Sequence, residues 1–156
     1  MILYHSSTVE VKEPDTTHSR LYLDFGKGFY LTSIHEQAVR YAERFLRRKR
    51  IAWLNTYELK DNLEGWKILY LESYDKQWLD FVSACRAGND TSDYDMVVGG
   101  IADDRVILTL DRYFQGELTQ EQALGLLKYE RPNIQYCIQS EQMLKQCLTF
   151  ISSEQL

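Results

Sequence analysis

The 156-residue sequence has two prolines, three cysteines and no low-complexity stretch, so it contains no obvious linker. Its length is that of one ordinary domain, and a single domain over residues 1–156 is predicted. Cys85, Cys137 and Cys147 are odd in number and widely spaced, which favours reduced thiols in a cytoplasm over a disulfide framework. No stretch is apolar for long enough to span a bilayer, and residues 1–5 lack the features of a signal peptide. We therefore expect a cytoplasmic protein without a membrane segment.

The chain also has fewer positively charged than negatively charged side chains. Lys and Arg total 18 against 23 Asp and Glu, which gives a net charge of −5 and argues against broad electrostatic binding of nucleic acid. Four cations nevertheless adjoin at residues 47–50, at the end of a predicted helix. Cations at that end offset the negative pole of the helix dipole, which is the interpretation we prefer. A local patch for phosphate or nucleic acid is the alternative.

Histidine is scarce, and its spacing excludes the usual metal sites. None of His5, His18 and His35 pairs with another His or with a Cys at metal-ligand spacing, so no metal site is predicted. The sequence has neither a Walker-type glycine loop nor a Rossmann glycine pattern. A nucleophilic pair of Cys137 with His5 stays open, because such partners need not be near in sequence. Cys137 lies in an apolar strand, however, where a core thiol is the usual explanation.

Aromatic residues make up 13% of the chain, and residues 24–32 combine them with two glycines. Gly26 and Gly28 permit backbone angles that a Cβ would forbid, and they let another group approach the chain closely. The residues that follow favour a strand over residues 28–32. The stretch therefore predicts a glycine turn that feeds a short strand. Its aromatic side chain is either presented to a ligand or buried behind a hairpin turn.

Short apolar runs and helical periodicities alternate along the rest of the chain. Strands are predicted at residues 2–5, 28–32, 51–59, 66–71, 96–101, 135–138 and 148–151, with the third and fourth joined as a hairpin and a glycine turn in 99–100. Helices are predicted from residues 33, 75, 103, 119 and 140, the first of them ending at residue 50. Residues 9–21 form a polar loop whose length suggests a functional role. This order of elements indicates an α+β fold, with one or two packed sheets and helices at the sides.

Capping signals mark four of the predicted helix starts. They are Ser33 with Glu36, Asp75, Asp103 with Asp104, and Thr119 with Gln122.

Three short segments together resemble the signature motifs of the ADP-ribosyltransferase superfamily. They are Tyr4-His5-Ser6-Ser7, Gly26-Lys27-Gly28-Phe29-Tyr30-Leu31-Thr32 and Asn133-Ile134-Gln135-Tyr136. Over nearly its whole length the chain also resembles a small bacterial family of that superfamily catalogued as a domain of unknown function, through residues 24–30, 94–99, 102–104 and 135–137. The resemblance implies two small sheets split around an NAD cleft, with flanking helices.

The resemblance also implies roles for individual residues. His5 would hydrogen-bond a hydroxyl of the nicotinamide ribose, and Tyr30 would stack on the nicotinamide ring. Gln135 occupies the place where many relatives have the catalytic Glu. With His5 and Tyr30, the residues expected to contact NAD are Gly28 in the turn and Ser6, which stands where relatives usually have Gly.

Gln135 can hold a ribose hydroxyl, but its amide cannot act as a general base. The acceptor must then be intrinsically nucleophilic or be deprotonated by another group, for which Asp24, Asp95 and Glu141 are unranked candidates. Arg20, in the loop before the glycines, can pair with the NAD pyrophosphate. An ordinary exposed loop arginine is the equally good alternative.

We therefore expect a mono-ADP-ribosyltransferase that uses NAD as co-substrate and modifies a macromolecule. A protein acceptor is favoured over a nucleic acid. In bacteria such domains often act as toxins, sometimes beside an antitoxin, and that too is only implied by the resemblance. The alternative is a non-catalytic module that holds NAD, ADP-ribose or a partner protein on the same scaffold. Gln135 and Ser6 favour the module, whereas His5, Tyr30 and the intact glycine turn favour the enzyme.

Overall fold

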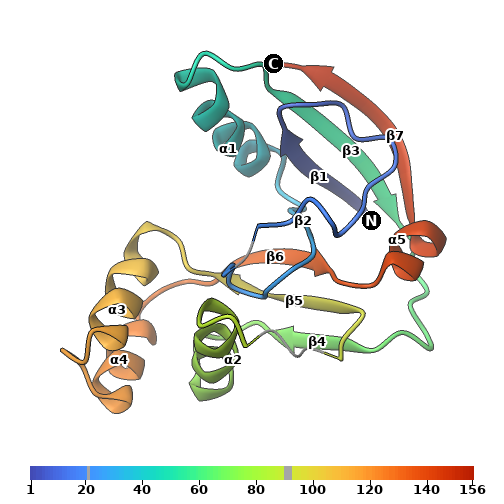
Figure 1. The fold of residues 1–156 in the computed structure, drawn as a ribbon. Helices are drawn as coiled ribbons and strands as arrows, with labels where there is room; N and C mark the ends of the chain where they lie inside the picture. The colour runs from blue at the N-terminus through green and yellow to red at the C-terminus, as the bar shows by residue number, and fades with distance from the viewer. Residues whose placement is uncertain (21, 90–92) are drawn as a thin grey trace.

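Two β-sheets and five helices make up the part of the chain that the structure describes, which is residues 1–20, 22–89 and 93–156 of a computed structural model (Figure 1). The strands are β1 (Ile2–Ser7), β2 (Phe29–Leu31), β3 (Trp53–Leu59), β4 (Ile68–Leu71), β5 (Met96–Ile101), β6 (Asn133–Ile138) and β7 (Leu148–Gln155). The helices are α1 (His35–Arg47), α2 (Lys76–Arg86), α3 (Asp104–Phe114), α4 (Gln120–Leu127) and α5 (Glu141–Cys147). The predicted α+β class is confirmed.

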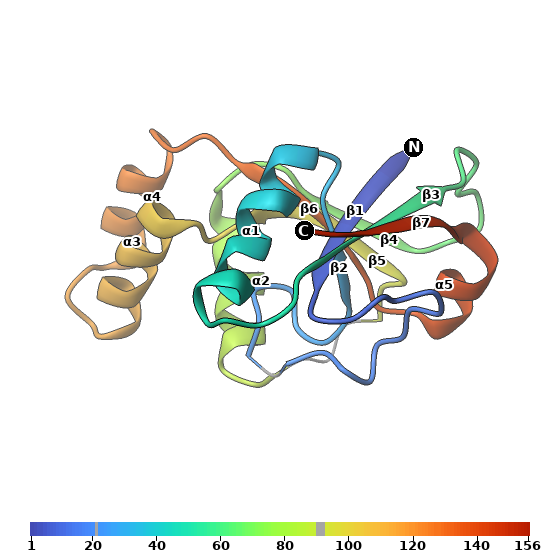
Figure 2. The same ribbon diagram turned by 90° about the horizontal axis from the view of Figure 1, so that it is seen from above.

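The first sheet has the strand order β1-β3-β7, and both outer strands run antiparallel to β3. Side chains alternate between its faces, so Leu3 and Tyr57 point into a buried apolar cluster. The opposite face meets α1, where the Ser6 hydroxyl donates a hydrogen bond to the carbonyl of Ala38. This face of the sheet is therefore closed by a helix, as Figure 2 shows from above.

The second sheet has the order β2-β6-β5-β4, with β4 parallel to β5 and the other pairs antiparallel. Both of its faces are buried, because alternate residues of β5 enter different clusters. Met96 and Val98 join the cluster shared with the first sheet, whereas Val97 joins a second cluster with Trp78 of α2. Helices α2, α3 and α4 supply most of the second cluster, so the second sheet is a central layer between two cores.

One backbone bridge joins the two sheets in the described part of the chain. Tyr4 of β1 and Thr32, just beyond β2, exchange two backbone hydrogen bonds of 2.8 and 3.0 Å. Strand β2 is consequently flanked by β6 on one side and, at this one point, by β1 on the other. Beyond this point β1 pairs only with β3 in the part of the chain that is described.

The predicted hairpin of residues 51–59 with 66–71 is wrong, because these runs belong to different sheets. Just after β3, the Lys60 N–H donates to the carbonyl of Cys147, which keeps the chain beside the first sheet. Before β4, the Lys67 N–H donates to the Asp95 carboxylate at 2.8 Å, which places it beside β5. The connection therefore crosses from one sheet to the other instead of turning back.

Most predicted helix starts are confirmed, but the first is not. The side chains of Asp75, Asp103 and Thr119 each cap a helix, and Thr119 does so in a full capping box with Gln122. No side chain caps α1, which begins at His35 rather than as a capping box at Ser33.

The Thr32 hydroxyl accepts the N–H of Ile34, the residue before α1, but it does not cap the N–H groups of the first helical turn. The helix ends at Arg47, before the predicted residue 50. There Lys49 adopts a φ of 56°, and the N–H of Arg50 bonds the carbonyl of Phe45, a helix-ending arrangement usually made with glycine.

The glycine turn predicted at residues 99–100 is wrong, because both glycines lie inside β5. A Cβ on Gly99 would lie 2.5 Å from the carbonyl oxygen of Leu71, and one on Gly100 would lie 2.6 Å from the ring of Tyr74. Glycine here permits close packing rather than a reversal of the chain.

Among the described residues, no helix is both long and apolar enough to cross a membrane. The three cysteines all lie in described segments, are buried and form no disulfide.

Candidate functional site

The glycine stretch forms a tight turn in which each glycine has its own reason. Gly26 has a φ of 80°, in the left-handed region that a Cβ disfavours. Gly28 packs closely on β6, and a Cβ there would lie 2.4 Å from the Sγ of Cys137 and 3.0 Å from the carbonyl of Ile138. Both predicted uses of glycine, special backbone angles and close approach, are therefore present.

Tyr30 fastens this turn from the following strand. Its hydroxyl donates to the Gly26 carbonyl at 2.6 Å and accepts the Phe25 N–H at 3.1 Å. Its ring lies nearly parallel to that of Phe25, with centroids 6.2 Å apart. Burial strongly raises the pKa of the phenol, so the hydroxyl stays protonated and keeps its donor role. The half-buried ring is consequently held in one position.

Asp24 anchors the other end of the turn. Its carboxylate lies 2.5 Å from Nη2 and 2.7 Å from Nε of Arg86 on α2, and its second oxygen accepts the Ala102 N–H at 2.7 Å. The carboxylate is buried and both oxygens are engaged. These contacts make Asp24 a structural anion that ties the turn to α2 and to the end of β5.

His5 reaches β2 from the neighbouring sheet. Its Nδ1 lies 2.8 Å from the carbonyl oxygen of Tyr30 and, because a carbonyl can only accept, Nδ1 carries the proton. Burial lowers the pKa of the imidazole, so the ring is neutral at pH 7 and its Nε2 is an acceptor. The ring centroid lies 4.3 Å from that of Phe29. His5 therefore offers one acceptor nitrogen where β1 adjoins β2.

Gln135 lies on the other neighbour of β2. Tyr30 pairs with Cys137 across the β2–β6 ladder, and residues two apart on a strand share a face, so Gln135 lies on the Tyr30 side. The register of β6 with β5 shows no bulge that would change this. The half-buried Gln135 amide makes no hydrogen bond to any residue that the structure describes. It is therefore available to a ligand.

A chain of polar side chains ties α1 to β6 beside Gln135. The Thr32 hydroxyl donates to the Gln37 Oε1 at 2.7 Å, and the Gln37 Nε2 donates to the Asn133 Oδ1. Asn133 lies two residues before Gln135 and on the same strand face. Sequence reasoning missed Gln37, because its partner lies 96 residues away and no local pattern marks the pair.

The remaining residues expected to contact NAD already have partners in the protein. The buried Ser6 hydroxyl donates to α1, as described above. The Gly28 N–H donates to the Ser19 hydroxyl at 3.1 Å. Arg20 is exposed, and its Nη2 donates to the Tyr41 hydroxyl at 3.1 Å.

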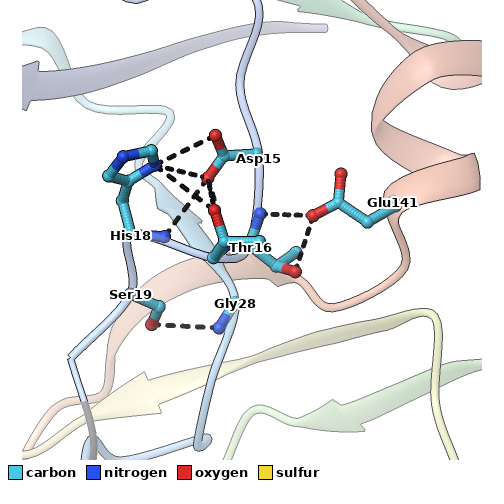
Figure 3. A network of polar contacts seen from close by, with 7 residues as sticks. Asp15, Thr16, His18, Ser19, Gly28 and Glu141 are labelled. Carbon is cyan, nitrogen blue, oxygen red and sulfur yellow. Dashed lines mark hydrogen bonds and ion pairs between the residues drawn. The ribbon is translucent and has the colours of Figure 1, made fainter.

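The loop before the glycine turn is fastened by side chains that Figure 3 shows from close by. Glu141 at the start of α5 accepts the N–H and the hydroxyl of Thr16 at 2.6 and 2.7 Å, and these bonds lower the pKa of its carboxyl. Asp15 pairs with the Nδ1 of His18 at 2.9 Å. Asp24 therefore has both carboxylate oxygens engaged in contacts within the protein, whereas Glu141 and Asp95 each have one oxygen engaged.

The structure brings the His5 ring into contact with the backbone carbonyl of Tyr30 and places Gln135 on the strand face to which the Tyr30 side chain belongs. One shared pocket for all three stays a prediction. A cavity in the structure has none of them in its lining, which consists of Lys67, Phe81, Ala84, Cys85, Asn89, Asp93 and Tyr94. Among the residues that are described, no group of three His, Cys, Asp or Glu side chains could hold a metal ion.

Comparison with known proteins bears on the family and not on the activity. Residues 1–150 match the family model described as "Protein of unknown function (DUF3990)". No curated protein and no solved structure matches the chain. The match covers well over half of the sequence, and its description names no activity, ligand or partner. The chain therefore belongs to the DUF3990 family.

Proposed function

We propose that this protein is an NAD-dependent mono-ADP-ribosyltransferase that modifies a macromolecular acceptor, on an ADP-ribosyltransferase-like split-sheet fold. The observation that carries the proposal is the placement of His5 and Gln135 on the two strands that flank Tyr30. These residues are the ones that the three motif resemblances single out. They come from segments up to 130 residues apart, and their convergence on β2 is not required by local structure.

The polar atoms left open by the protein suit a ribose and a planar ring. The neutral His5 offers Nε2 as an acceptor for a hydroxyl proton, since Nδ1 is held by the Tyr30 carbonyl. The Gln135 amide offers both an acceptor and donors. Tyr30 supplies an aromatic ring whose position is fixed by the turn. A prearranged set of this kind binds with little loss of side-chain freedom.

The reaction would use these groups for orientation and electrostatics. Transfer breaks the bond between nicotinamide and its ribose, with the electron pair leaving on nicotinamide, and positive charge develops on the sugar. His5 and Gln135 would fix the ribose hydroxyls, and the Gln135 carbonyl dipole would lie near that charge. Gln135 cannot remove a proton, so the acceptor would attack as an intrinsic nucleophile or lose its proton to solvent.

A binding module is the second candidate, and one observation favours it. The position expected for a catalytic carboxylate holds Gln135, and Asp24, Asp95 and Glu141 are all engaged in structural contacts. A site with Gln in place of the catalytic carboxylate can still hold NAD, ADP-ribose or a partner protein through the same hydrogen bonds.

The test compares the natural protein with Gln135→Ala and Gln135→Glu, using labelled NAD with and without a cell lysate. If the enzyme proposal holds, the natural protein labels a macromolecule. Gln135→Ala should lose binding and transfer, because a ligand hydroxyl is left unpaired. Gln135→Glu should hydrolyse NAD faster, because it adds a negative charge beside the developing cation and a possible base. Gln115→Glu, on the exposed end of α3, is the matched control.

The outcomes separate the two candidates. NAD binding without hydrolysis or transfer in any variant supports the module. Robust transfer by Gln135→Ala contradicts the role assigned to this residue. If labelling occurs, growth of bacteria that express the natural protein or Gln135→Ala tests whether the activity makes the protein a toxin.

A further inference from the structure

A relay of three polar side chains, Thr32, Gln37 and Asn133, connects α1 to β6 next to Gln135. The Thr32 hydroxyl lies 2.7 Å from the Gln37 Oε1, and the Gln37 Nε2 bonds the Asn133 Oδ1. Asn133 and Gln135 lie on one face of β6, about 7 Å apart along the strand. The relay therefore ends beside the amide that the candidate site leaves open.

The direction of these hydrogen bonds is fixed at Thr32. This residue is only 5% exposed, so its hydroxyl hydrogen needs an acceptor within the protein. Its Oγ1 already accepts the N–H of Ile34, and the acceptor that the described residues offer its hydrogen is the Gln37 Oε1. A reversed Gln37 amide would present a second donor to Thr32 and leave the buried hydrogen unpaired. Gln37 therefore presents its Nε2 to Asn133.

The Asn133 amide is oriented by this relay. Because its Oδ1 accepts from Gln37, its Nδ2 and both Nδ2 hydrogens are left for another partner. The Nδ2 makes no hydrogen bond to any residue that the structure describes. Asn133 is half-buried, as Gln135 is, so solvent and ligands can reach it. Two amides thus lie open on one strand face, and the relay makes Asn133 the donor of the two.

We infer that Asn133 donates to a sugar hydroxyl beside the one that Gln135 holds, and that Gln37 is the positioning residue that orients it. Each hydroxyl of a ribose has an oxygen that accepts and a hydrogen to donate. Asn133 can serve only the oxygen, whereas the unbonded Gln135 amide can serve either. The two amides therefore suit two adjacent hydroxyls. The orientation of Asn133 follows from the relay alone, whereas the choice of a ribose rests on the proposed function.

The orientation is tested without a ligand. Gln37→Glu keeps an acceptor for Thr32 but turns a second acceptor toward Asn133, so the Asn133 amide should turn and donate to it. NMR spectra of the side-chain amides, assigned with Asn133→Asp, should then show an Asn133 hydrogen that exchanges with water about tenfold more slowly than in the natural protein. Equal exchange in the two proteins would overturn the inference.

The ligand role is tested by titration of the full chain with NAD and ADP-ribose. Gln37→Glu and Asn133→Asp should each weaken binding about tenfold, because an acceptor replaces the donors that face the ligand. Their urea midpoints should stay near that of the natural protein, since the relay keeps its hydrogen bonds. A merely structural role would instead lower the midpoints.

Two further variants control for charge. Thr32→Val adds no charge and lets the Gln37 amide turn either way, so it should also weaken binding, by a smaller factor. Gln115→Glu adds the same charge as Gln37→Glu at an exposed position on the end of α3, and should bind as the natural protein does.

The outcomes separate this inference from the proposed function. Weaker binding by Gln37→Glu and Asn133→Asp supports the inference even if no transfer occurs. Binding by both variants that is as strong as by Gln115→Glu overturns the inference and leaves the proposed function standing. If the natural protein binds neither NAD nor ADP-ribose, the proposed function fails and the ligand role of Asn133 is overturned with it.

Discussion

Different atoms of Tyr30 carry its structural role in the turn and its candidate role in ligand binding. The hydroxyl bonds the turn at Phe25 and Gly26, whereas a stacking role would need only the ring. Removing the whole side chain would therefore mix a loss of stability with a loss of ligand binding.

Tyr30→Phe should separate these roles. The change keeps the ring but leaves a buried N–H and a buried carbonyl of the turn without partners, so we expect a loss of about 1–3 kcal/mol in the free energy of unfolding. NAD affinity at a temperature where the variant is folded should be nearly unchanged. Urea denaturation and NAD titration are the two measurements. Tyr129→Phe, at a tyrosine that is 80% exposed, controls for loss of a phenol hydroxyl.

Two results would contradict this account of Tyr30. An unchanged urea midpoint would mean that the hydroxyl does not hold the turn. A large loss of NAD affinity in folded Tyr30→Phe would mean that the hydroxyl, and not the ring, contacts the ligand.

At the scale of elements, the segment from residue 9 to residue 20 behaves as a strap, a name we use for these residues only. It has no helix or strand of its own. The bonds of Glu141 to Thr16 attach it to α5, and the bond of Ser19 to Gly28 attaches it to the glycine turn (Figure 3). The strap is therefore held at a few side-chain contacts rather than by a backbone ladder.

Glu141→Ala should release the middle of the strap. Trypsin should then cut after Lys12 about tenfold faster than in the natural protein, because local opening costs less without two hydrogen bonds to a carboxylate. Gln142→Ala, at the neighbouring exposed position of α5, should leave the rate unchanged. Mass spectrometry of timed digests gives the rates, and equal rates for both variants would refute the attachment.

The effect of Glu141 should also depend on pH. The Thr16 bonds lower the pKa of Glu141 in the folded protein, so its stabilisation is complete above the ordinary value of 4.5 and is lost as pH falls through the folded value. The difference between natural protein and Glu141→Ala should thus disappear in strong acid.

Local chemistry was sufficient to predict most helix starts and the glycine turn. The caps at Asp75, Asp103 and Thr119 depend on residues within one turn of each other, and they form as expected. Strand pairing is harder to predict, because β-propensity indicates that a segment forms a strand but not which strand it pairs with. The predicted hairpin was wrong for that reason, since β3 pairs with β1 and β7 whereas β4 pairs with β5.

The candidate site shows the same limit. The motifs at His5, Tyr30 and Gln135 could be read along the sequence. The hydrogen bonds that occupy Asp24 and Glu141 depend on Arg86, Ala102 and Thr16, which lie 62, 78 and 125 residues away. Local sequence spacing does not predict contacts over such separations. The sequence alone therefore could not rank these carboxylates as candidate bases.

For the whole molecule, His5 makes stability depend on pH near neutrality. Its pKa is lowered by burial, so between that value and the ordinary 6.5 the unfolded chain binds a proton that the folded protein does not. Stability is therefore complete above about pH 6.5 and falls as the pH is lowered, by up to about 1.4 kcal/mol per pH unit.

His5→Asn should flatten this dependence, because the Asn amide can donate to the Tyr30 carbonyl without titrating. Urea midpoints at pH 7.5 and 5.5 test the expectation, in a range above the titration of Asp15 and Glu141, whose pKa values are both lowered. A slope that survives in His5→Asn would place its origin elsewhere.

The strand order of the first sheet has a consequence for synthesis on the ribosome. Strand β3 pairs with β1 on one side and with β7 on the other, and its Trp53 lies opposite Gln155. A nascent chain that has emerged as far as β6 can assemble the sheet of Tyr30 and Gln135, while β3 still has one edge open. The sheet that holds His5 closes only after β7 has also emerged, which ends at Gln155. The support of the candidate active site is thus completed only after β7 has emerged, and a chain that stalls between β6 and β7 would contain His5, Tyr30 and Gln135 without that support.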